Sequence, residues 1–248
     1  MLDFIRIACA VPAVKVGDVR KNTEDICAYM ERADSANADI VLFPELCLTG
    51  YSCGDLFFQD TLWKAAKSGL REICAHSKKY PALNVVVGLP VRLNSKLLNC
   101  AVLIQDGGLR GIVPKTYIPG HGEYCESRWF ASGSDLIHGP EIHYAGFECI
   151  ISPNQIFEIG NASFAVEIGE DLHCPIPPSS YHALAGAQIT ANLSAGNETV
   201  MSGVRRDMML AQHTLQAKCA YVYSSACLDS SQDLVFTGHS SIWENGAL

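Results

Sequence analysis

Short, wholly apolar runs separated by amphipathic stretches are the feature that most restricts how this chain can fold. Residues 40–43 read IVLF and residues 84–90 read NVVVGLP, the type of strand that is buried on both faces of a sheet. A first strand is expected at 4–11. Helices are expected to begin at an Asn22-Thr23 N-cap and to span about 62–79, because apolar side chains recur there at helical spacing. This alternation predicts an α/β sheet covered by helices.

The second half of the chain returns to the same alternation after a stretch of hairpins. Residues 97–105 and 109–115 flank a DGG turn and predict a hairpin. We expect strands near 147–151 and 155–159, around a Pro-Asn turn, to continue it. The remaining elements are expected as strands at 164–168, 187–194 and 221–226, helices near 179–186 and 204–219, and a last hairpin from Leu234.

Length, charge and hydropathy limit the class of protein. The chain has 248 residues, a net charge of −8 and 48% hydrophobic residues, which fits one large α/β domain. We expect no nucleic-acid partner, because phosphate contacts need clustered Lys and Arg. We also expect no membrane span, since no apolar run approaches about 18 residues, and the N-terminus lacks a signal-peptide pattern. These features favour a cytoplasmic protein.

The C-terminal sequence ENGAL lies where the second arm of the last hairpin is expected to begin. We therefore expect residues 1–248 to form one domain that is truncated before the end of this hairpin. No linker, low-complexity tract or tandem repeat divides it. A longer parent protein is expected.

Eleven cysteines are present, and none forms a C-x-x-C pair. Most lie in apolar surroundings, as Cys9, Cys100, Cys149 and Cys219 do. Such cysteines are typical of small buried hydrophobic residues in a reducing compartment. We expect neither a disulfide framework nor a metal site.

Three positions at the ends of apolar strands could carry chemistry, because ligands of parallel sheets bind at the carboxyl ends of strands. Glu45 in LFPELCLTGY could act as a general base, and Lys115 in GIVPK could stabilise an oxyanion. Gly169 in VEIGEDLHC could contribute backbone N–H groups from a tight turn. Each residue taken alone is more often part of a solvated loop or a simple turn.

Taken together, these segments resemble a known family. FPE, VPK and EIxEDL follow one another at spacings similar to those of the carbon–nitrogen hydrolase (nitrilase) superfamily. The longer segments are similar to the glutaminase domain of glutamine-dependent NAD synthetase, over nearly the whole chain. These segments are LFPELCLTGYSCGDLF, PKTYIPGHGEYCESRWF, EDLHCPIPPSSYHALAGA, ANLSAGNETV and DLVFTGHSSIWENG.

The resemblance implies a four-layer αββα sandwich with a Glu-Lys-Cys triad. Glu45 would be the general base and Lys115 the oxyanion stabiliser, while a cysteine would attack the side-chain amide of glutamine and release ammonia. The resemblance also implies a homo-oligomer and a separate synthetase domain, which these residues lack. ATP, magnesium and deamido-NAD would belong to that domain, so no cofactor is expected in this one.

The position of the nucleophilic cysteine falls at Gly169. A glycine cannot form a thioester, so we expect this chain not to hydrolyse glutamine by the covalent route. Cys174 is the nearest thiol, but it would need a different backbone path to reach the same crevice.

Other departures from the family lie at the expected substrate site. His121 replaces a tyrosine, Gly196 replaces a serine and Ser202 replaces a basic residue, whereas Glu170, which could bind the ammonium group of the substrate, is kept. Several changes around one pocket fit natural decay of the site, although removal of the cysteine by engineering stays open.

Two further readings stay open. One is a free-standing carbon–nitrogen hydrolase that acts on another amide or a nitrile. The other is a non-catalytic module for oligomer assembly or for docking a synthetase domain, and Gly169 is the feature that favours it.

Overall fold

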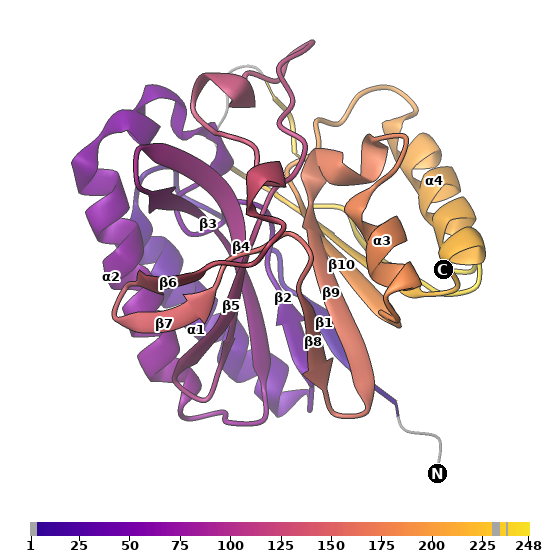
Figure 1. Cartoon of the computed structure of the whole chain (residues 1–248), viewed down its shortest axis with the longest axis horizontal. Coiled ribbons are helices and arrows are strands. Elements are labelled where there is room, and N and C mark those ends of the chain that lie inside the picture. Colours follow the sequence, from indigo (N-terminus) through magenta and orange to yellow (C-terminus); the bar gives the residue numbers. More distant parts are fainter. Residues whose placement is uncertain (1–3, 230–233, 237) are drawn as a thin grey trace.

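The computed structural model describes residues 4–229, 234–236 and 238–248. Two five-stranded sheets lie face to face, with helices on their outer faces (Figure 1). The first sheet has the strand order β1 (Ile7–Cys9), β2 (Ile40–Leu42), β3 (Asn84–Leu93), β4 (Lys96–Gln105) and β5 (Gly108–Pro114). Its first three strands are parallel, and β3, β4 and β5 pair antiparallel.

The second sheet has a parallel centre and antiparallel edges. Its strand order is β12 (Ser240–Trp243), β11 (Ala220–Ser225), β10 (Ile189–Ser194), β9 (Ala162–Ile168) and β8 (Ile156–Ile159). Strands β9, β10 and β11 are parallel, while β8 and β12 run antiparallel to their neighbours. A separate hairpin of β6 (Glu141–Tyr144) and β7 (Phe147–Ile150) contacts β5.

The inner layers follow from burial of alternate strand residues between the two sheets. Leu42 and Val86 of the first sheet form one apolar cluster with Phe164, Val166 and Leu193 of the second. Successive side chains of a strand point to opposite faces, so their sequence neighbours face the outer layers. This explains why the central strands are apolar throughout rather than alternating.

The outer layers are pairs of helices. Helices α1 (Val19–Ser35) and α2 (Asp60–Ser77) pack on the first sheet, where Ile26 and Leu70 join Val85 in one cluster. Helices α3 (Pro178–Leu184) and α4 (Ser202–Ala217) cover the second sheet, where Leu210 packs against Tyr221. The predicted α/β fold, a four-layer αββα sandwich, is confirmed.

Helix α1 begins earlier than the predicted N-cap at Asn22-Thr23, so that prediction was wrong. Asp18 is the N-cap, and its side chain accepts a hydrogen bond from the N–H of Lys21. Asn22 lies inside the helix, where its side chain bonds to backbone groups of Lys15 and Leu48. A residue type that usually caps helices is used here to hold the preceding loop.

The strands expected near 147–151 and 155–159 exist but do not continue one hairpin. Strand β7 pairs with β6, and β8 pairs with β9 in the other sheet. Between them, the side-chain amide of Gln155 donates to the carbonyls of Ile112 (2.6 Å) and Ser152 (3.1 Å). These bonds hold the chain where it crosses from the first sheet to the second.

The last hairpin starts later than predicted. No strand begins at Leu234, and β12 starts only at Ser240. Beyond β12, Glu244 and Ala247 exchange two backbone hydrogen bonds of 2.9 Å and form a tight turn. Residues 230–233 and 237 of the predicted hairpin lie outside the described residues.

All eleven cysteines are free thiols. Those that are fully buried are Cys47, Cys53, Cys74, Cys100, Cys149 and Cys219. Only Cys125 is exposed. Most of the thiols therefore serve as small apolar side chains of the core.

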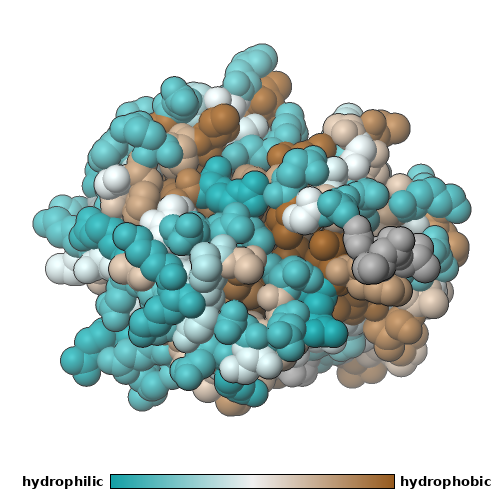
Figure 2. Space-filling model, turned by 90° about the horizontal axis from the view of Figure 1, so that it is seen from below, coloured by the Kyte–Doolittle hydropathy of each residue, from teal (hydrophilic) through white to brown (hydrophobic). Residues whose placement is uncertain are grey.

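Apolar side chains are exposed on the helices of the second sheet. They are Tyr181 and Leu184 on α3 and Val204, Met208 and Leu215 on α4. Seen from below, Figure 2 shows more apolar surface on the right, the side of these two helices in Figure 1, than on the left. Among the residues that the structure describes, no helix is long and apolar enough to cross a membrane.

Candidate functional site

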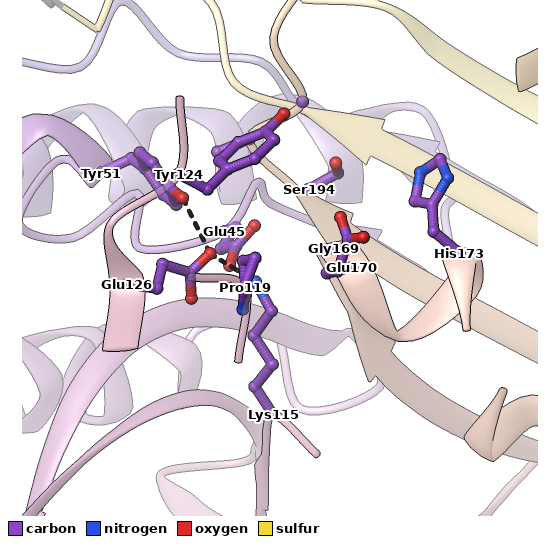
Figure 3. Close-up of a pocket in the computed structure, with 12 residues that line it drawn as sticks. Glu45, Tyr51, Lys115, Pro119, Tyr124, Glu126, Gly169, Glu170, His173 and Ser194 are labelled. Atoms are coloured by element: carbon purple, nitrogen blue, oxygen red, sulfur yellow. Dashed lines mark hydrogen bonds and ion pairs between the residues drawn. The ribbon is translucent and has the colours of Figure 1, made fainter. Parts of the chain in front are cut away.

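A buried lysine lies between two carboxylates at the upper end of the first sheet (Figure 3). Lys115 directly follows β5, and its residue is only 1% exposed. Its Nζ lies 2.7 Å from Oε1 of Glu45 and 2.6 Å from Oε1 of Glu126. Both carboxylates are also buried, so all three ionisable groups of the cluster lie away from solvent. Such an arrangement is stable only when every charge is bonded.

Glu45 reaches this cluster because the loop after β2 packs tightly on β3. An added Cβ at Gly88 of β3 would lie 2.4 Å from the N of Leu46 and 2.5 Å from the O of Pro44, so only glycine allows this approach. The side-chain amide of Asn99 donates to Glu45 Oε1 at 2.6 Å. Burial raises the pKa of Glu45 to about 7, with Lys115 opposing the shift.

Gly169 begins a 3-10 turn (Gly169–His173) at the end of β9 and has a positive φ of 49°. Its N–H donates to the side-chain oxygen of Asn192 (3.0 Å), and the amide of Asn192 donates back to the Gly169 carbonyl (3.3 Å). An ideal Cβ at Gly169 would lie 2.6 Å from Oε2 of Glu45 and 3.0 Å from Nζ of Lys115. A side chain at this position would therefore reach both charged groups, and the carboxylate of Glu45 would have to shift to admit it.

The turn is also tied to the segment that follows Lys115. The buried carboxylate of Asp171 accepts hydrogen bonds from the N–H groups of Ile168, Thr116 and Tyr117. Burial raises the pKa of Asp171 to about 8, and the charge of Glu167 adds to the shift. Asp171 thus fixes the turn of the second sheet against the strand end of the first.

Two adjoining pockets lie beside these residues. The inner pocket has a volume of about 30 Å³ and the outer one about 380 Å³, and both are partly open to solvent. The inner pocket is lined by Glu45, Tyr51, Lys115, Pro119, Tyr124, Glu126, Gly169, Glu170, His173, Ser194, Ala195 and Gly196. Tyr124, Glu170, His173 and Gly196 line both pockets. One ligand could therefore extend from one pocket into the other.

The structure places the predicted substrate residues around these pockets. Glu170 and Gly196 line both, whereas His121 and Ser202 line only the outer one. The His121 side chain is largely exposed, and its Nε2 lies 4.0 Å from Oε1 of Glu170. Ser202 donates a hydrogen bond of 2.6 Å to Glu198. The expected convergence of Glu45, Lys115 and Gly169 is found, and the predicted substrate positions lie along the two adjoining pockets.

Three residues of the charged cluster were not predicted. Asn99 joins Glu45 to Glu126, and the hydroxyl of Tyr51 donates to Glu126 at 2.8 Å. A lone Asn inside the apolar run LLNCAVLI was a signal for Asn99. Glu126 lies in a polar loop, GEYCESRW, where nothing in the local pattern distinguishes it from its exposed neighbours.

Cys174 does not line the inner pocket. Its thiol is directed to the carbonyl of Glu170, with 3.6 Å between sulfur and oxygen. Burial raises its pKa to about 11, and the charge of Asp171 adds to the shift. Cys174 is thus both displaced from the charged cluster and held in its unreactive thiol form.

Two sheets packed face to face, with a buried Glu45–Lys115 pair next to the turn at Gly169, define a sandwich of the nitrilase type. The family model of the carbon–nitrogen hydrolases matches residues 6–245. The chain belongs to this family.

Particular relatives are glutamine-dependent NAD(+) synthetases. The chain is 34% identical to that of Mycobacterium leprae over 250 residues and 36% identical to that of Mycobacterium bovis over 252 residues. In both cases the match covers 99% of this chain and 36% of the relative, so the chain spans about a third of their length.

Solved structures share the fold. A glutamine-dependent NAD(+) synthetase from Cytophaga hutchinsonii superposes with a TM-score of 0.88 and 26% identity, covering 99% of this chain and 40% of that chain. An amidase from Nesterenkonia sp. AN1, a C145A mutant in complex with butyramide, has a TM-score of 0.78 and 21% identity. That match covers 98% of this chain and 84% of the amidase, and it shows the shared fold alone.

Proposed function

We propose that this chain is the glutaminase-type domain of a glutamine-dependent NAD synthetase, and that it binds glutamine without hydrolysing it through a thioester. Its relatives support the kind of domain. The single observation that carries the loss of hydrolysis is the position of Gly169. Glu45 and Lys115 lie next to the place where its Cβ would be, and glycine provides no nucleophilic atom there.

The remaining groups could still perform the steps that surround the missing one. Glu45, with a pKa near 7, could accept a proton from a nucleophile and later return it to a leaving amine. Lys115 could stabilise negative charge on the amide oxygen. Neither group replaces the nucleophile, because Lys115 is held protonated between two carboxylates.

The partners and cofactors that we propose follow from the relatives. The parent protein would contain a synthetase domain that uses ATP, magnesium and deamido-NAD, and this domain would use none of them. Among the described residues, no group of three or more His, Cys, Asp and Glu is arranged to hold a metal ion. We also propose that the protein is cytoplasmic and that it forms a homo-oligomer. The exposed apolar side chains of α3 and α4 support the oligomer.

The test is to restore the thiol with Gly169→Cys. We expect the wild-type chain to release no ammonia from glutamine above background. In the variant, the thiol at residue 169 should react with iodoacetamide, because Lys115 favours the thiolate. Ammonia release should stay roughly 100-fold below the rate of about 1 per second of an ordinary enzyme. The altered positions His121 and Gly196 account for this deficit, since each lost bond to a charged group costs about 1.5–3 kcal/mol.

A matched control is Gly146→Cys, which places a thiol at an exposed β-turn that also has a positive φ. Mass spectrometry should show its alkylation without any ammonia release. An unreactive thiol at residue 169 would reject the site assignment. Full activity from Gly169→Cys would show that only the nucleophile is missing, and rapid release by the wild-type chain would refute the proposal.

Two other functions remain candidates. Gly169 favours a non-catalytic module for assembly or docking, and this reading predicts no glutamine binding by calorimetry. A free-standing hydrolase of another amide or a nitrile would instead show turnover of such substrates by the wild-type chain. Glutamine binding without turnover distinguishes the proposed function from both.

A further inference from the structure

An incompletely bonded arginine lies in the outer pocket. Arg206 of α4 is only 7% exposed. Its Nη1 and Nη2 both approach the same oxygen of Glu198, at 3.3 and 3.4 Å, and its Nε has no hydrogen-bond partner. A well-formed guanidinium–carboxylate pair uses two oxygens at about 2.7–2.9 Å. Arg206 therefore keeps donors available although it is buried.

The surroundings of Arg206 show where these donors can be used. Arg206 lines the outer pocket together with Glu170 and Tyr223. Its guanidinium lies 5.5 Å from the centre of the Tyr223 ring, and the Tyr223 hydroxyl donates to Ser194, which lines the inner pocket. Arg206 thus lies beside the route from the outer pocket to the charged cluster.

The outer pocket presents charged groups of both signs. Its lining includes two carboxylates, Glu123 and Glu170, and two guanidinium groups, Arg205 and Arg206, of which Arg206 also pairs with Glu198 behind it. A ligand that carries one positive and one negative group fits such a lining better than a neutral or singly charged ligand does. An α-amino acid is a ligand of this kind.

We propose that Arg206 is the specificity residue that binds the carboxylate of an α-amino acid amide, a role that rests on the proposed function. The side-chain amide of the ligand would lie at Gly169, its ammonium group at Glu170, and its carboxylate at Nε and one Nη of Arg206. Ser202 carries no charge, and Arg206 follows it by one helical turn on the same face of α4. The positive charge that position 202 lacks is therefore supplied from position 206.

Three small molecules test the two charged groups of the ligand separately. L-Glutamine carries both charged groups, glutaramate lacks the ammonium group, and 4-aminobutanamide lacks the carboxylate. Their dissociation constants are measured by calorimetry with the whole chain, in which Gly169 prevents turnover by the covalent route. Arg206→Gln should weaken L-glutamine and glutaramate roughly 10- to 100-fold and leave 4-aminobutanamide unchanged.

Three further variants serve as controls. Glu170→Gln should show the opposite selectivity and weaken L-glutamine and 4-aminobutanamide but not glutaramate. Arg20→Gln removes an exposed arginine of α1 that pairs with Glu24 and lines neither pocket, and it should change each constant by less than about 3-fold. Arg206→Lys keeps the positive charge but lacks the planar guanidinium group. Its dissociation constants for L-glutamine and glutaramate should lie between those of the wild type and Arg206→Gln.

The outcomes are distinct. Equal weakening of all three molecules by Arg206→Gln would mean a structural role and overturn the inference, as would undiminished binding of glutamine. In both cases the proposed glutamine-binding function survives. If the wild-type chain binds none of the three molecules, both the inference and the proposed function are overturned.

Discussion

The site has one half from each sheet, and the two halves differ in how their residues are held. The half from the first sheet contains Glu45, Asn99 and Lys115, with Glu126 from the following loop, joined by bonds of 2.6–3.2 Å. The half from the second sheet contributes Gly169, Gly196 and Ser202 near the same pockets. The first half keeps every charged group, whereas the second has glycine at two positions.

This difference shows where a site can lose its function without losing its fold. A buried charge that is deprived of its partner destabilises a protein by several kcal/mol, so the groups of the first half depend on one another. A side chain that only faces a pocket can be removed at little cost to stability. Selection for a stable fold is therefore enough to retain the residues of the first half. The residues of the second half are retained only by selection for activity.

The largest effect that tests this contrast is expected from Lys115→Met. The change leaves Glu45 and Glu126 buried without their cation and should lower the free energy of unfolding by about 3–5 kcal/mol. Lys96→Met is the matched control, because Lys96 forms a 2.9 Å ion pair with Asp135 at an exposed site and should change stability by less than about 1 kcal/mol. Urea denaturation measures both, and similar losses would remove the contrast.

A smaller effect is expected from pH. The pKa of Glu45 is raised from 4.5 to about 7, so the folded chain holds this proton more tightly than the unfolded chain. Stability should therefore fall as pH rises from about 4.5 to 7, by at most about 3 kcal/mol for this group. Below that window both states are protonated, and above it both are ionised. Glu45→Gln should flatten this part of the pH profile in urea denaturation, and an unchanged slope would contradict the assignment.

The smallest effect is expected from Gly196→Ser, which alters the second half. A Cβ there would lie 3.1 Å from the Tyr223 hydroxyl, so that side chain must move slightly. We expect a change in unfolding free energy within about 1 kcal/mol. Thermal denaturation measures it, and a loss comparable to that of Lys115→Met would show that the second half is also part of the framework.

The sequence predicted the parts of this arrangement that depend on local pattern. Glu45, Lys115 and Gly169 each follow an apolar strand, and the carboxyl ends of these strands lie together at the same end of the two stacked sheets. The bonds of Glu126 and Gln155 could not be predicted, because their partners lie far away in the chain. Asn22 misled the prediction of the helix start, since its side chain holds a loop that only the folded structure reveals.

The left-handed conformation of residue 169 has a consequence for the history of such a site. Any residue other than glycine is strained by roughly 1–2 kcal/mol at a φ of 49°. A catalytic side chain at this turn must be maintained against that strain by selection for turnover. Once turnover no longer matters to the organism, glycine is the replacement that stabilises the fold, while Asn192 preserves the shape of the turn. Replacement of a nucleophile by glycine at such a position therefore relieves strain and is favoured once selection for turnover ends.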